Sequence, residues 1–184
     1  MKKVVLILVS AAFFFWPHLI SAQGDLEGKP FAARLGIIVY DRLTPKVNDL
    51  NNINRDLRSI LKSIENDRKY NILAQVIWCG EMIAAHGHYE IRLLGLHEKI
   101  KDEAKNDYYR DNAIQTKAAA KVVRDRLEDI KRLFPFIKDE ETVALVEKVI
   151  NHAAKMAGDL DITVLMLEQQ AKGGGGPIKE QTIK

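Results

Sequence analysis

The 184-residue chain contains one cysteine, Cys79, and only five prolines. A single thiol excludes any intrachain disulfide, so the folded protein must be stabilised by packing alone. The chain also lacks the patterns of common catalytic and cofactor sites. It has no phosphate-binding loop, no nucleophile elbow and no pair of cysteines for zinc or haem, and it lacks the Glu-x-x-His pairs of di-iron bundles. These absences predict a non-enzymatic protein.

Strand-forming sequence is almost absent as well. Residues 31–40 contain the run Ile37-Ile38-Val39, but no second strand exists for it to pair with, and an isolated strand is not stable. We therefore interpret this stretch as helix. No internal repeat is strong enough to indicate a solenoid.

The first 22 residues have the three-part pattern of a secretory signal peptide. Lys2 and Lys3 precede an apolar run at residues 4–16, and Ala22 offers a small residue at the expected cleavage point. The run is shorter than the ~20 residues that span a bilayer. An uncleaved signal anchor is the alternative, and it would be the only membrane contact. The sequence thus predicts a periplasmic or secreted mature chain.

The mature chain is nearly neutral. Without the two lysines of the signal it carries 26 basic and 25 acidic residues. No basic strip with interleaved aromatic residues is visible either. The composition therefore argues against a nucleic-acid partner.

Apolar residues recur at spacings of three and four along four long segments, which is the period of an α-helix. The segments cover residues 31–64, 70–104, 109–134 and 143–171, with polar turns at residues 65–69 and 105–107. Because short connections imply antiparallel neighbours, the sequence predicts an all-α, elongated, up-down-up-down four-helix bundle over residues 31–171. Residues 23–30 would form an N-terminal lead, and residues 172–184 a flexible, glycine-rich tail.

Two features of the first two helices affect the packing. Thr44-Pro45 either begins a new helix or kinks one long helix, and both alternatives stay open. In the second helix, Trp78, Tyr89 and Leu96 widen the apolar arc. We therefore expect the second helix to be the most buried of the four.

Several polar side chains stand where the apolar pattern predicts Leu or Val. Asn54 in the first helix and Thr116 in the third are interpreted as a structural polar seam. In the second helix His86 and Glu90 lie one turn apart on the seam face, and His97 extends the row. Cys79 shares this face and is expected to be a buried, unreactive thiol.

Two hypotheses explain the row of His86 and Glu90. The first is a structural polar layer, in which His86 or a neighbouring arginine holds Glu90 and the layer satisfies the Asp41 carbonyl that Pro45 leaves free. The second is a metal or haem site with His97 and His152 as further ligands. Because one His/Glu pair cannot complete a metal site, we favour the first hypothesis and predict no cofactor.

The leading functional hypothesis is an exported interaction or ligand-sensing module of the periplasm or cell envelope. Its partner would be another envelope protein or a small ligand, and a homo-oligomer is possible. The alternative hypothesis is a four-helix-bundle protein that binds a metal or haem through its buried His/Glu cluster. Asp161, beside the seam of the fourth helix, is expected to reach water at the helix flank.

Overall fold

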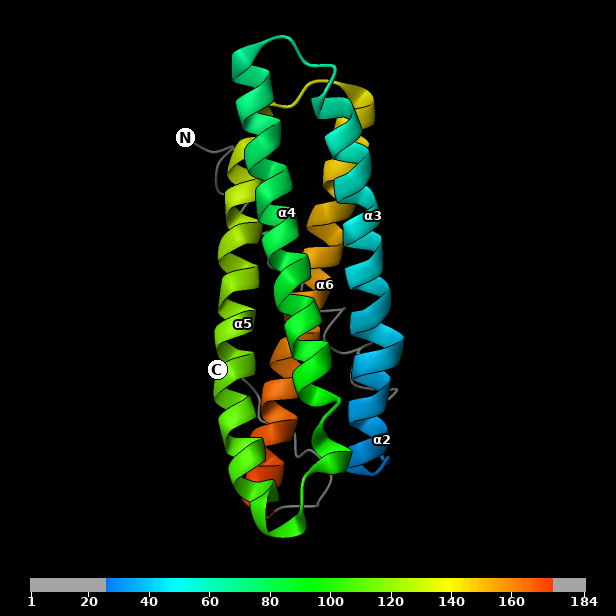
Figure 1. Cartoon of the computed structure of the whole chain (residues 1–184), viewed down its shortest axis with the longest axis vertical. Coiled ribbons are helices and arrows are strands. Elements are labelled where there is room, and N and C mark those ends of the chain that lie inside the picture. Colours follow the sequence, from blue (N-terminus) through cyan, green and yellow to red (C-terminus); the bar gives the residue numbers. More distant parts are fainter. Residues whose placement is uncertain (1–25, 174–184) are drawn as a thin grey trace, which may run out of the picture.

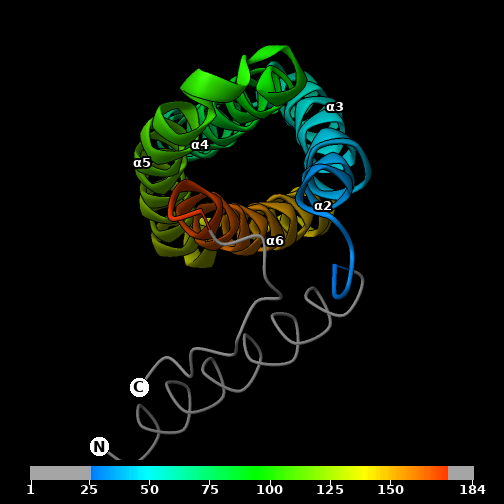
Figure 2. The ribbon, with the colours of Figure 1, turned by 90° about the horizontal axis from the view of Figure 1, so that it is seen from below.

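The structure is a computed structural model, and it describes residues 26–173. The described residues form four long antiparallel helices with no strand among them (Figure 1). Seen along its length, the bundle has α3 and α5 at opposite corners, each packed between α4 and α6 (Figure 2). The predicted all-α four-helix bundle is confirmed. The expected signal peptide, residues 1–22, and the tail beyond Gly173 lie outside the described residues.

The first helix is continuous through Pro45. It consists of α2 (Phe31–Gly36), the π-helical segment η1 (Ile37–Leu43) and α3 (Thr44–Leu61). Backbone N–H and Oγ1 of Thr44 both donate to the Val39 carbonyl, the latter at 2.7 Å. These bonds span five residues, so the wider π turn accommodates the proline without ending the helix. Of the two alternatives for Thr44-Pro45, the single helix is correct.

The second helix, α4 (Asp67–Leu94), begins with a side-chain cap, because Oδ1 of Asn66 accepts a 3.0 Å hydrogen bond from the Lys69 backbone. It ends ten residues earlier than the sequence analysis predicts. Two short 3₁₀ turns follow, η2 (His97–Lys99) and η3 (Asp102–Ala104). The third helix, α5 (Lys105–Leu133), then begins, so the predicted turn at residues 105–107 is wrong.

Side chains from outside the helix explain this early end of α4. The Tyr108 hydroxyl donates to the Leu93 carbonyl at 2.5 Å, and Nδ1 of His97 lies 3.1 Å from the Leu94 carbonyl oxygen. The last carbonyls of a helix have no partner within it, so such contacts replace the bonds of a further turn. Gly95, which follows Leu94, also disfavours continuation of the helix.

The fourth helix, α6 (Glu140–Ala171), follows the 3₁₀ turn η4 (Phe134–Phe136). Asp139 caps it by accepting hydrogen bonds from the backbone N–H and the hydroxyl of Thr142, at 2.8 and 2.7 Å. These bonds to the charged form lower the pKa of the Asp139 carboxyl. Glu140 and Glu141 in the first turn add negative charge where the helix dipole favours it.

Close contact between α3 and α4 depends on two glycines of α4. A methyl group on Gly80 would overlap the side chain of Asn54, and one on Gly87 would overlap Cγ2 of Val47. Asn54 is buried, as the sequence analysis predicts. The small residues thus let the two helices approach each other closely.

The most buried helix is α6, and the expectation for α4 is wrong. The side chains of Trp78, Tyr89 and Leu96 are 51%, 49% and 44% exposed, although the pattern predicted that they would extend the core. Trp78 and Tyr89 lie on the side of α4 that faces away from the bundle axis. None of the helices within residues 26–173 is both long and apolar enough to cross a membrane.

Candidate functional site

Glu90 is the most unusual side chain in the bundle interior, because it is a fully buried carboxyl group. Its Oε2 accepts a 2.7 Å hydrogen bond from the hydroxyl of Thr116 on α5. Its Oε1 has no hydrogen-bond partner among residues 26–173. Burial raises the pKa of Glu90 to about 7, and the Thr116 bond opposes only part of that rise. Glu90 is thus held in place by one donor and carries a proton over much of the acidic range.

The partner of Glu90 differs from the expected one. We predicted that His86 or an arginine would hold the carboxylate and that this layer would satisfy the Asp41 carbonyl. Instead the partner is Thr116, which the sequence analysis placed in the polar seam of α5 without connecting it to Glu90. Around Pro45 the helix is supported locally, since Thr44 bonds to Val39 and Nζ of Lys46 donates to the Arg42 carbonyl at 2.9 Å.

Tyr108 and Asn112 complete the polar part of the α4–α5 contact near Glu90. Burial, with a smaller contribution from the charge of Glu90, raises the pKa of Tyr108 to about 12. Its hydroxyl therefore stays protonated and donates to the Leu93 carbonyl. Asn112 is buried, and its Nδ2 lacks a hydrogen-bond partner in the described part of the chain. The helical periodicity of the sequence gives neither Tyr108 nor Asn112 a polar role at this contact.

The four candidate ligands do not come together as one metal site. His97 lies beyond the end of α4, with its ring edge against Phe31, 6.5 Å between ring centroids. His152 faces α3, where its Nε2 is 3.8 Å from Oδ2 of Asp49, and burial lowers the pKa of its imidazole. Within residues 26–173, no group of three or more His, Cys, Asp or Glu side chains could hold a metal ion.

A second buried carboxylate, Asp159 on α6, escaped the sequence analysis. Its Oδ1 lies 3.5 Å from Nη1 of Arg42, and its Oδ2 lies 2.8 Å from Nζ of Lys46. All three side chains are nearly buried, so this ion pair joins η1 and α3 to α6 in a poorly solvated environment. Asp161, the carboxylate that the sequence analysis singled out instead, is half exposed and pairs with Arg124 at 2.7 Å. Its expected place at the helix flank is correct.

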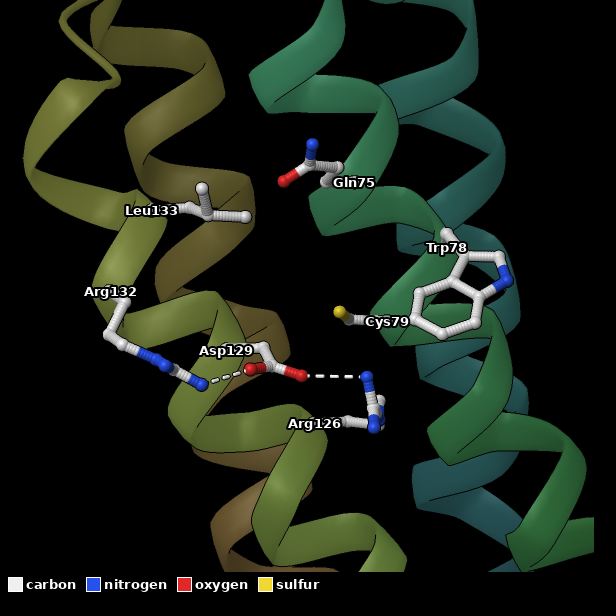
Figure 3. A pocket seen from close by; sticks show the side chains of 7 residues that line it. All are labelled: Gln75, Trp78, Cys79, Arg126, Asp129, Arg132 and Leu133. Carbon is white, nitrogen blue, oxygen red and sulfur yellow. Dashed lines mark hydrogen bonds and ion pairs between the residues drawn. The ribbon is translucent and has the colours of Figure 1, made fainter.

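Cys79 lies at the bottom of a groove of about 410 Å³ between α4 and α5 (Figure 3). The thiol is only 3% exposed, and burial raises its pKa, as does the negative charge of Asp129. Asp129 lies between Arg126 and Arg132 and pairs with both. The Arg126 guanidinium also covers the Trp78 ring, 5.1 Å from its centroid. The groove therefore has an aromatic wall, and it has two guanidinium groups whose charge is partly balanced by the Asp129 carboxylate between them.

An apolar row runs along the solvent side of α4, starting at this groove. We call it the outer stripe, and it consists of Trp78, Met82, Ala85 and Tyr89. The two aromatic side chains are about half exposed, Ala85 is exposed and Met82 is partly so. Spacings of four, three and four residues place all four on one helix face, which has no charged member. The apolar pattern of the sequence predicts Trp78 and Tyr89 in the core instead, and this prediction is wrong.

Comparison with protein-family models, with curated proteins and with solved structures found no match. The chain is thus defined by its class, an all-α four-helix bundle. The features that bear on its function are the outer stripe, the adjoining groove and the buried polar groups.

Proposed function

We propose that this chain is an exported, non-enzymatic helical-bundle protein that acts as an interaction or ligand-sensing module of the periplasm or cell envelope. The observation that supports this proposal is the outer stripe of α4. Half-exposed Trp and Tyr side chains in a contiguous apolar row are typical of protein interaction sites, where aromatic residues and Met are enriched. The export part of the proposal depends on the signal-peptide pattern of residues 1–22.

The groove at the upper end of the outer stripe supports a second mode of recognition, which is the binding of a small ligand. Its volume of about 410 Å³ is in the range of small-ligand sites. The Trp78 ring provides an apolar wall, and Arg126 and Arg132 provide donors at the rim (Figure 3). A partner that covers the outer stripe would also contact the Arg126 guanidinium, which lies over the Trp78 ring.

The metal- or haem-binding alternative receives less support from the geometry. His86 and Glu90 share a face of α4, but His97 and His152 contact other neighbours. Glu90 already has a protein partner in Thr116. We therefore place the function on the surface of α4 rather than in the bundle interior.

Site-specific photo-crosslinking in intact exporting cells tests the proposal. A photoreactive amino acid at position 89 should give a discrete adduct, whereas the same group at position 40 should not. Tyr40 is the matched control, because it is 68% exposed but lies on η1 and outside the outer stripe. The mature N-terminus should be Gln23. An intact Met1, or equal labelling from positions 40 and 89, would contradict the proposal.

A further inference from the structure

Three charged side chains are buried in the described part of the chain, and the charge of two of them is compensated. Asp159 forms ion pairs with Arg42 and Lys46, and Glu90 is neutralised when it takes up a proton. The third is Arg34 on α2, which is only 7% exposed. Because a guanidinium group cannot be deprotonated in a protein, Arg34 cannot lose its charge as Glu90 does.

Arg34 also lacks a partner of opposite charge. Within residues 26–173 its guanidinium makes no ion pair and no hydrogen bond, and its Nε is buried without a partner. The two terminal nitrogens, Nη1 and Nη2, are not among the buried atoms, so they reach the surface. A charge that is removed from water is unfavourable unless an opposite charge and hydrogen bonds accompany it. The fold thus holds a cation whose donors open only toward the solvent.

We propose that Arg34 anchors a binding site for a small oxyanion, which is a carboxylate or a phosphate group, at the end of the bundle where α2 begins. The planar guanidinium presents N–H groups whose spacing matches the oxygen atoms of a carboxylate or a phosphate. An anion at this place supplies the missing charge and accepts hydrogen bonds from the terminal nitrogens. The site lies at the lower end in Figure 1, away from the groove between α4 and α5.

Two other polar atoms at this end of the bundle are buried without a partner among residues 26–173, namely Nε2 of His97 and Oε1 of Gln169. The His97 ring contacts Phe31, which lies one turn before Arg34. Gln169 lies in the last turn of α6, which packs against α2 (Figure 1). Each can present an N–H at the unpartnered position, the imidazole by taking up a proton and the amide by turning over. An anion bound at this end favours both changes.

The first test measures direct binding of inorganic phosphate and of acetate by isothermal titration calorimetry, in a chloride buffer. Wild-type protein should bind one anion per chain, and Arg34→Met should bind it at least about tenfold more weakly, because charge-assisted hydrogen bonds are lost. Arg55→Met removes an exposed arginine of α3 and should bind like wild type. Preference for one of the two anions would identify the group that the site accepts. Absence of saturable binding of either anion up to about 10 mM would overturn the inference.

The second test measures how thermal stability depends on the anion. The melting temperature of wild type should rise in a saturable way as phosphate replaces chloride at constant ionic strength, because a bound anion stabilises the folded state. The melting temperature of Arg34→Met should show only the general effect of phosphate, which is excluded from protein surfaces. Equal responses of the two proteins would overturn the inference.

The stability of Arg34→Met in chloride alone distinguishes an anion site from a purely structural arginine. The variant should be at least as stable as wild type there, because it removes an unpaired buried charge and keeps a long, flexible side chain. A clear loss of stability would show that the protein itself satisfies the guanidinium, and would overturn the inference. None of these measurements involves the outer stripe, so this inference and the proposed function can fail separately.

Discussion

Among the residues that the structure describes, the Thr116 hydroxyl on α5 donates the one hydrogen bond that the Glu90 side chain on α4 receives, at 2.7 Å, inside a fully buried contact between the two helices. One neutral donor does not compensate for the removal of a carboxylate from water. The pKa of Glu90 therefore rises to about 7. The protonation of Glu90 and the stability of the bundle are consequently linked.

Replacement of Glu90 by Gln should change how stability depends on pH. The folded protein binds the Glu90 proton more tightly than the unfolded chain, so stability falls as pH rises from the unfolded pKa of 4.5 through the folded value of about 7. Above pH 7 the penalty reaches about 3 kcal/mol. Urea unfolding should find Glu90→Gln more stable than wild type at pH 8 and similar to it at pH 4. The control is Glu81→Gln, because Glu81 lies on the same helix, is only partly buried and pairs with Arg58. A similar gain in stability at pH 8 for Glu81→Gln would contradict the assignment of the effect to the burial of Glu90.

Replacement of Gly87 by Ala should destabilise the bundle, because the new methyl group would overlap Cγ2 of Val47. Overpacking of this kind costs about 1–3 kcal/mol. Gly158 on α6 is the matched control, since a methyl group there meets no atom within 4 Å. Gly158→Ala should stabilise the protein by up to about 1 kcal/mol through helix propensity. Thermal unfolding measures the stability of both variants. Equal changes in stability for Gly87→Ala and Gly158→Ala would contradict the close approach of α3 and α4.

Removal of the Asp159 charge should destabilise the protein strongly. Asp159→Asn leaves Arg42 and Lys46 nearly buried without their carboxylate, and breaking such a pair costs about 3–5 kcal/mol. Asp161→Asn removes a charge two residues away whose pair with Arg124 is half exposed, and it should cost less than about 1 kcal/mol. Denaturant unfolding compares the two variants. A small effect of Asp159→Asn would show that the ion pairs of Asp159 with Arg42 and Lys46 contribute little to the free energy of unfolding.

Cys79 should react slowly with thiol reagents while the protein is folded. The side chain is 3% exposed, and the pKa of the thiol is raised, so little reactive thiolate is present near neutral pH. Full labelling should follow the addition of denaturant. A cysteine introduced at the exposed Ser59 should react at once under native conditions. Fast labelling of Cys79 in the folded protein would mean that the α4–α5 groove opens readily.

The sequence was sufficient to predict the helical fold because its signal is repeated along the chain. Buried apolar positions recur every three or four residues in all four helices, so single irregular positions do not change the outcome. The burial of Asn54, Glu90 and Thr116 followed from the same periodicity. The position at which α4 ends could not be predicted from this periodicity. It depends on Tyr108 and His97, which contact the last carbonyls of α4 only in the folded chain.

The features missed by the sequence analysis depend on contacts between helices. Asp159 lies beside the seam of α6 and resembles any flank residue until Arg42 and Lys46 are placed opposite it. Trp78 and Tyr89 are apolar, and periodicity alone cannot distinguish a wider core face from an exposed second face. Their shared spacing with Met82 and Ala85 was the available signal.

The π-helical segment has a consequence for how the first helix meets the core. Counting back from Leu43 with the heptad spacing of α3 would make Tyr40, Gly36 and Ala33 the inward positions. Tyr40 is instead 68% exposed, and Val39 and Leu35 are buried. The extra residue of the π turn therefore changes the phase of the helix, so that two stretches with different inward faces contact one core. Deletion of one residue within 37–43 would remove this change of phase, because Leu35 and Leu43 would then lie seven residues apart on one continuous α-helical face.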